Sequence, residues 1–180
     1  MKPVASLLPW RRRDAHADEI YGAIVAQARL PVFYQEFGVP DTLVGRFTVL
    51  LLHLFAVLHR LNDGDSKARS MGQALADRFT ADMETVLREI GIGDLSIPKK
   101  VRGLAASSAA LLQDFEEALK RGDAAFAAAI ARSLPLDETQ ADAVSGRLVP
   151  YVKRIVRHLE HEPLQDICAG ELKFPKVESA

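Results

Sequence analysis

The sequence has little of what a disulfide-linked or membrane-spanning protein needs. Cys168 is the only cysteine among 180 residues, which excludes an internal disulfide framework and a cysteine-rich zinc site. The longest apolar run, residues 47–58, is shorter than the roughly 20 residues that a spanning helix requires. The arginines near the N-terminus follow its short apolar piece instead of preceding it, unlike a secretory signal. We therefore expect a soluble, cytoplasmic protein.

An excess of charge of one sign is lacking as well. The formal net charge is −1, so the chain as a whole has no electrostatic attraction to nucleic acid or to anionic lipid. Any such contact would depend on a local patch of cations. We expect no DNA partner.

Sequence motifs for catalysis are also absent. The chain contains neither of the phosphate-binding patterns G-x-x-x-x-G-K-[ST] and G-x-G-x-x-G, no G-x-S-x-G and no H-E-x-x-H. His158 and His161 share one helical face next to Glu162, but two histidines at a helix end are more often surface residues than metal ligands. We expect no metal, no cofactor and no enzymatic activity.

What the sequence does contain is a central hydrophobic helix, predicted at about residues 42–61. Pro40 ends any preceding helix and Asp41 is placed to cap a new one. The run that follows is apolar except for Thr48 and His53. A helix that is apolar nearly all round is wrapped by other helices or lies against lipid.

The rest of the chain shows helical periodicity and no segment with strand-like alternation. We predict an all-α fold, a compact bundle of about six or seven helices around the central one. Pro150 should kink or split the last long helix. The expected organisation is a flexible basic arm at 1–14, a single helical domain at 15–162 and a weakly ordered tail at 163–180. The arm, with Trp10 and three arginines, is either a disordered terminus or an anchor for lipid or RNA phosphate.

Three polar side chains, Arg46, His53 and Arg60, recur every seven residues along the central helix and so share one stripe. His53 is either a core histidine with hydrogen-bond partners or a catalytic group, and the sequence supplies no nucleophile for it. The two arginines need carboxylates, with Asp41, Asp77 and Asp82 as candidates, or they face a groove.

Two kinds of surface could bind a partner. The aromatic residues Phe33, Tyr34 and Phe37 precede the turn that opens the central helix, although such residues more often fill a core. Cations are unfavourable at a helix N-terminus without an anionic partner, and a predicted helix opens with three of them, Lys99, Lys100 and Arg102. These three are either a solvated basic edge or a docking patch for an anionic partner. The last helix adds a second basic face, made of Arg147, Lys153, Arg154, Arg157 and His158.

Several motifs together resemble one family. These are IVAQAR, the FY pair before GVPDT, then GRF, LLH, DMETVLRE and GIGD. In this combination, over residues 21 to about 105, the chain resembles the ubiquinol–cytochrome c chaperone family. It is most similar to the short alphaproteobacterial members. There is one departure: where the family carries a FYGR-like segment after KKVRGLA, this chain has SSAALLQDF.

The resemblance implies an all-α, non-enzymatic assembly chaperone. Such proteins bind newly made cytochrome b during biogenesis of the respiratory ubiquinol–cytochrome c reductase. The resemblance also implies a partner protein or the ribosome nearby, and a cytoplasmic location with peripheral contact at the inner membrane. The expected partner-binding residues are Phe33, Tyr34, Phe37, Asp41, Arg46, Lys99, Lys100 and Arg102. The alternative is an anion-, RNA- or ribosome-binding module that uses residues 99–102 and the last helix.

Overall fold

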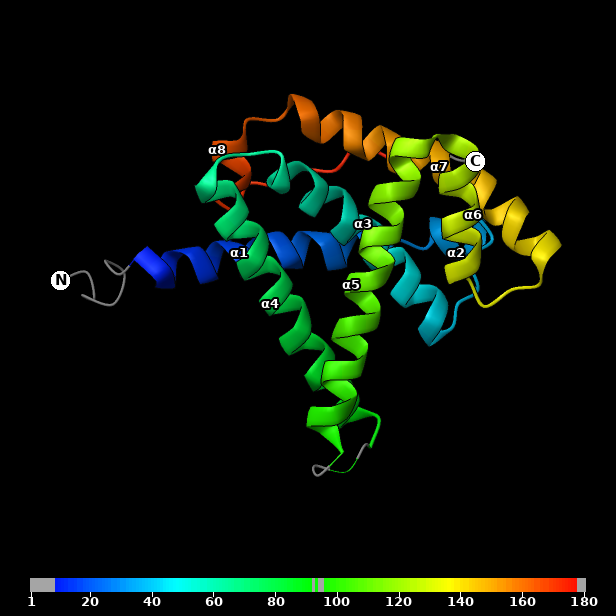
Figure 1. Cartoon of the computed structure of the whole chain (residues 1–180), viewed down its shortest axis with the longest axis horizontal. Coiled ribbons are helices and arrows are strands. Elements are labelled where there is room, and N and C mark those ends of the chain that lie inside the picture. The colour runs from blue at the N-terminus through cyan, green and yellow to red at the C-terminus, as the bar shows by residue number, and fades with distance from the viewer. Residues whose placement is uncertain (1–8, 92, 94–95, 178–180) are drawn as a thin grey trace.

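The protein is described by a computed structural model that covers residues 9–91, 93 and 96–177, with side chains from Arg13 onward. Within these residues the secondary structure is entirely helical, which confirms the all-α prediction (Figure 1). Six of the helices are long, and two consist of a single turn. Their bounds are α1 Pro9–Ala28, α2 Val32–Gln35, α3 Leu43–Asn62, α4 Ser66–Glu89, α5 Ile97–Arg121, α6 Asp123–Ser133, α7 Glu138–His161 and α8 Leu164–Ile167.

Helix α3 is the centre of the bundle, as the sequence predicts. It contacts α1, α4, α5 and α7, and between Thr48 and Val57 only Leu50 is not fully buried. By length and composition α3 could cross a membrane. Here four neighbouring helices cover its apolar surface. Such a helix is covered either by other helices or by lipid, and the structure shows the first of these.

Short polar side chains cap α3 and α7. Thr42 caps α3, because its hydroxyl accepts a hydrogen bond from the Gly45 amide at 3.2 Å. The expectation that Asp41 is this cap is wrong. Asp137 caps α7 in the same way, by accepting from the Gln140 amide at 2.9 Å. Ser96, the residue before α5, has a helical backbone conformation and makes no capping hydrogen bond.

Pro150 does not split the last long helix. Helix α7 is continuous from Glu138 to His161. Pro150 and Gly146 both lie on the exposed side of α7, where water can bind the carbonyl that proline leaves without a donor. The predicted split is therefore wrong.

Both ends of the chain differ from expectation. Helix α1 begins at Pro9, so residues 9–14 of the expected arm are helical, while residues 1–8 lie outside the described part. In the expected tail, Ile167 and Cys168 are buried, and the Phe174 ring lies 5.4 Å from the His53 ring. The described part of the tail thus packs on the bundle.

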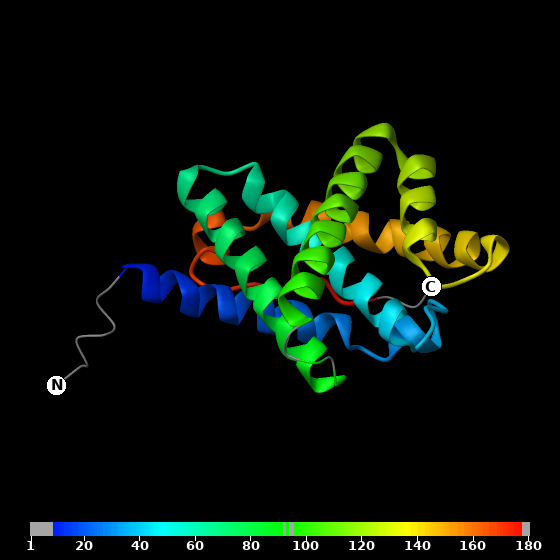
Figure 2. The same cartoon turned by 60° about the horizontal axis from the view of Figure 1, so that its bottom comes forward.

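Helices α4 and α5 form a hairpin that stands out from the rest of the molecule. Figures 1 and 2 show the two helices converging toward the turn that joins them, and this turn projects away from α7 and α2. We call residues 88–91, 93 and 96–102 the hairpin end. Its position matters because three of the predicted partner-binding residues lie there.

Candidate functional site

His53 lies in a closed, fully hydrogen-bonded environment. Its Nδ1 is 2.7 Å from the Val49 carbonyl oxygen, so Nδ1 carries the proton and donates it. Its Nε2 accepts from the Tyr151 hydroxyl at 2.8 Å. Burial lowers the pKa of His53 to about 4. His53 is therefore the core histidine of the two alternatives, neutral at pH 7.

The two phenylalanines proposed for partner binding belong to this same closed environment. Phe33 and Phe37 are 0% and 2% exposed. The Phe33 ring lies 5.4 Å from His53 and 5.1 Å from Tyr151, centre to centre. Both phenylalanines fill the core, so the expectation that they face a partner is corrected.

The outer members of the polar stripe have different partners. Arg46 Nε lies 2.5 Å from the Asp41 carboxylate, one of the carboxylates that the sequence nominated. Arg60 instead donates to two main-chain carbonyls at the end of α7, those of Leu159 at 2.7 Å and Glu162 at 3.0 Å. Arg60 thus satisfies free carbonyls at a helix C-terminus, where a cation is favourable.

The turn before α3 is held in place from two sides. Gly38 has a φ of 79°, and the Arg147 Nε of α7 donates to the Phe37 carbonyl at 2.9 Å. Gly45 lies against the turn so closely that a Cβ there would be 2.1 Å from the Pro40 carbonyl oxygen. The entrance of α3 is therefore a rigid structure that needs glycine at both positions.

Beside this turn lies an apolar groove between α1, the start of α3 and α4. We call it the entrance groove; its cavity volume is about 180 Å³. Apolar side chains from all three helices line it, with charged groups at its rim. The lining residues are Val25, Ala28, Arg29, Tyr34, Leu43, Arg46, Phe47, Leu50, Asp82, Met83 and Val86.

The charges at the rim are mostly paired. Asp82 accepts from the Tyr21 hydroxyl at 2.9 Å and lies 3.7 Å from Arg78. Arg46 pairs with Asp41 and lies over the Tyr34 ring, 5.4 Å from its centre. Burial, opposed by Arg46, raises the pKa of Tyr34.

Two large apolar side chains next to the entrance groove are open to solvent. Leu43 is 63% exposed and Val44 is 50% exposed, in the first turn of α3. The sequence pattern does not predict this exposure, since both residues continue into the apolar run of a core helix. Of the predicted residues, Tyr34, Asp41 and Arg46 do lie together here. Sequence reasoning missed Leu43, Val44 and Arg29.

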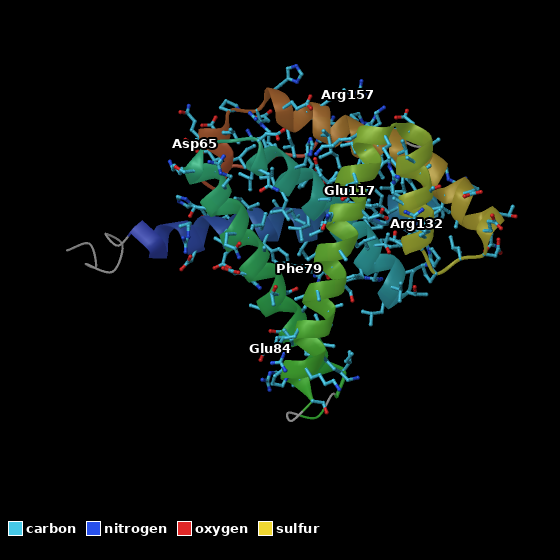
Figure 3. All side chains as sticks on the ribbon, in the orientation of Figure 1. Asp65, Phe79, Glu84, Glu117, Arg132 and Arg157 are labelled. Carbon is cyan, nitrogen blue, oxygen red and sulfur yellow. The ribbon has the colours of Figure 1, made fainter. Side chains whose placement is uncertain are left out.

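The predicted basic residues Lys99, Lys100 and Arg102 lie elsewhere, at the hairpin end. All three are exposed, and no ion pair to them occurs within the described chain. The cations of α7 are largely engaged in the fold: Lys153 pairs with Asp123 at 2.5 Å. In Figure 3, Glu84 marks the hairpin and Arg157 marks α7 at opposite edges of the molecule. The two basic regions therefore do not form one surface.

The histidines near the end of α7 bind main-chain oxygens. His158 Nε2 lies 3.1 Å from the Lys173 carbonyl, and His161 Nδ1 lies 2.7 Å from the Arg157 carbonyl. In the described part of the chain, no group of three or more His, Cys, Asp or Glu side chains is placed to hold a metal ion.

Comparison with known proteins identifies the family to which the chain belongs. The structure is similar to one described as the crystal structure of the Cbp3 homolog from Brucella abortus, with a TM-score of 0.81 and 31% sequence identity over 92% of each chain. The fold is thus that of a Cbp3 homologue. The family model described as ubiquinol-cytochrome C chaperone matches residues 35–174. The chain belongs to this family, which confirms the resemblance inferred from its motifs.

Two relatives bear matching descriptions. The chain is 25% identical over 171 residues to the ubiquinol-cytochrome-c reductase complex assembly factor 1 of Xenopus laevis, covering 94% of this chain and 85% of that protein. It is 23% identical over 171 residues to the factor of the same name from Mus musculus, of which it spans 58%. The family is one of assembly chaperones for this respiratory complex.

Proposed function

We propose that this protein binds newly made cytochrome b and, without catalysing a reaction, assists its incorporation into ubiquinol–cytochrome c reductase. Family membership supports the role in assembly of the complex. That the client is cytochrome b is an additional part of the proposal, which the protein's surface supports. Cytochrome b is an apolar membrane protein, and a chaperone for it needs an apolar surface of its own.

The observation that carries the proposal is the exposed apolar surface at the start of α3. Leu43, which lines the entrance groove, and Val44, the residue after it in α3, are both exposed to solvent. Exposed apolar side chains that adjoin an apolar groove, with a polar rim around them, are typical of a protein-binding site. The rigid turn before α3 keeps this surface formed before the client arrives, which lowers the cost of binding.

The same geometry suits transient binding. A surface of a few side chains is small compared with the roughly 1,600 Å² of a stable interface. A chaperone has to release its client as assembly proceeds, so a small apolar contact is appropriate. We propose that this occurs in the cytoplasm, with peripheral contact at the inner membrane, where the ribosome and a small partner protein can be close by.

Complementation in cells tests the proposal. Cells that lack the protein should contain less ubiquinol–cytochrome c reductase, measured by the haem absorbance of the complex. Wild-type protein should restore it, and the double variant Leu43→Asp, Val44→Asp should not. Arg102→Glu, a charge change at the hairpin end, is the matched control and should restore it. A normal level of the complex in the deletion strain would refute the proposal.

The alternative function, binding of an anion, RNA or the ribosome, rests on the exposed cations of the hairpin end. The α5 N-terminus there has no side-chain cap, so its amides add to the attraction for an anion. With three cations involved, the logarithm of affinity should fall with the logarithm of salt concentration with a slope of at most about −3. Binding of a ribosomal RNA fragment that is insensitive to salt and to Lys99→Ala, Lys100→Ala would remove this alternative.

A further inference from the structure

The entrance groove has two features that restrict what it can bind. Its cavity of about 180 Å³ is slightly larger than the ~150 Å³ cavity that holds one benzene ring in a protein core. Its walls at Phe47, Leu50, Met83 and Val86 are apolar. The cavity therefore fits one large apolar side chain and is too small for two.

The second feature is an unbalanced cation, Arg29. Arg29 lines the groove and is exposed. Its guanidinium makes no hydrogen bond or ion pair within the described residues, whereas Arg46 pairs with Asp41 and Asp82 with Tyr21 and Arg78. The groove lining itself holds two guanidiniums, Arg29 and Arg46, and one carboxylate, Asp82, so its surplus charge is positive and complements a carboxylate.

The form of the bound segment follows from its backbone. The described part of the chain contains no β-strand, so it offers no sheet edge with which an extended peptide could pair. A segment that enters an apolar groove must then satisfy its own amide and carbonyl groups, and a helix does so. A groove between helices is the usual receptor for an amphipathic helix.

We infer that the entrance groove receives one amphipathic helix of the client, which inserts a single large apolar side chain between Phe47 and Val86 and places a carboxylate within one helical turn of it, against Arg29. Leu43 and Val44 cover the apolar residues of that helix next to the inserted one. This inference rests on the proposed function and names what the client presents to the site.

Two synthetic helical peptides test it, with binding to the full chain followed by fluorescence anisotropy. Both carry one Phe on the apolar face; four residues further on, one peptide has Glu and the other has Lys. Wild-type protein should bind the Glu peptide about three- to tenfold more tightly, since each exposed charge pair contributes little. Arg29→Glu should reverse the preference. Arg121→Glu, the same charge change at an exposed position at the C-terminal end of α5, should leave it unchanged.

Two further variants test the apolar contact. Val86→Trp fills the cavity and should weaken both peptides by about tenfold or more, with retained helical circular dichroism showing that the protein is folded. Replacing the peptide Phe by Ala should do the same without any change in the protein. Equal binding of the Glu and Lys peptides, or of the Phe and Ala peptides, would overturn the inference. The proposed function would survive that result, because it is decided by the level of the respiratory complex in cells.

Discussion

The middle and the first turns of helix α3 show how one helix can be both scaffold and binding surface. Around the middle, which we call the closed side, His53 is enclosed by Phe33, Tyr151 and Phe174, and both ring nitrogens are hydrogen-bonded. At the first turns, which we call the open side, α3 lines an open groove and exposes Leu43. Both regions are apolar in sequence, but only the closed side is covered by neighbouring side chains.

This difference assigns separate tasks to the polar residues of α3. His53 and Arg60 bind partners within the fold, so they fix the position of α3 against α7. Arg46 pairs with an exposed carboxylate next to an apolar opening, where a partner can reach it. Changes on the closed side should therefore affect stability, and changes on the open side should affect binding.

The largest expected effect is the loss of an aromatic ring from the closed side. Phe33→Ala removes a fully buried ring and should lower the free energy of unfolding by about 3–5 kcal/mol. Leu43→Ala, on the open side, should change it by no more than about 0.5 kcal/mol. Urea denaturation followed by circular dichroism measures both. Equal losses in the free energy of unfolding for the two variants would contradict the distinction between the closed and the open side.

The closed side should also make stability depend on pH. The folded-state pKa of His53, about 4, lies below the ordinary 6.5 because burial disfavours the charged form. Between these values the unfolded chain binds more protons, so stability falls as pH drops from 6.5 to 4, by about 3 kcal/mol in total. His53→Gln should flatten this part of the profile. An unchanged slope in that variant would show that another group is responsible.

A substitution in the entrance turn should lower the free energy of unfolding less than the loss of a core ring does. Gly45→Ala brings a Cβ into the Pro40 carbonyl oxygen, and the resulting displacement should cost about 1–3 kcal/mol. Gly103→Ala is the matched control, because a Cβ on that exposed helical glycine meets no neighbour within 4 Å. The control should be neutral or more stable by up to ~1 kcal/mol. Thermal unfolding compares the two, and a harmless Gly45→Ala would mean that the turn is not rigid.

The smallest effect is expected at the hairpin end. The double variant Lys99→Ala, Lys100→Ala removes two exposed cations and should leave the free energy of unfolding within about 0.5 kcal/mol of wild type. Because the proposed client binds at the entrance groove, this variant should also restore the respiratory complex in deletion cells. A variant that does not restore the complex would indicate that the client binds at the hairpin end.

The sequence was sufficient for the fold and for the role of α3. Its apolar run and terminal turn residues predict α3 to within about one residue at each end. The Arg46 partner was also among the nominated carboxylates. These features depend on residues that are close in the chain, which periodicity and capping rules describe well.

The site was harder to predict because exposure depends on distant segments. Phe33 and Leu43 are both apolar residues near the same turn, yet Tyr151 of α7 packs against the first, which is fully buried, and the second is 63% exposed. Arg60 was expected to pair with a carboxylate or to face a groove, and it binds the α7 carbonyls instead. Local pattern carries no information on which helix end lies opposite. The family motifs did identify the neighbourhood of the groove through the GVPDT turn.

The central claim, that the client binds at the entrance groove, is tested most directly by site-specific crosslinking in living cells. A photoreactive amino acid replaces Leu43 in one strain and Arg102 in another, and both strains are irradiated while cytochrome b is being made. Our account predicts an adduct with cytochrome b from position 43 and none from position 102. An adduct from position 102 alone would contradict it.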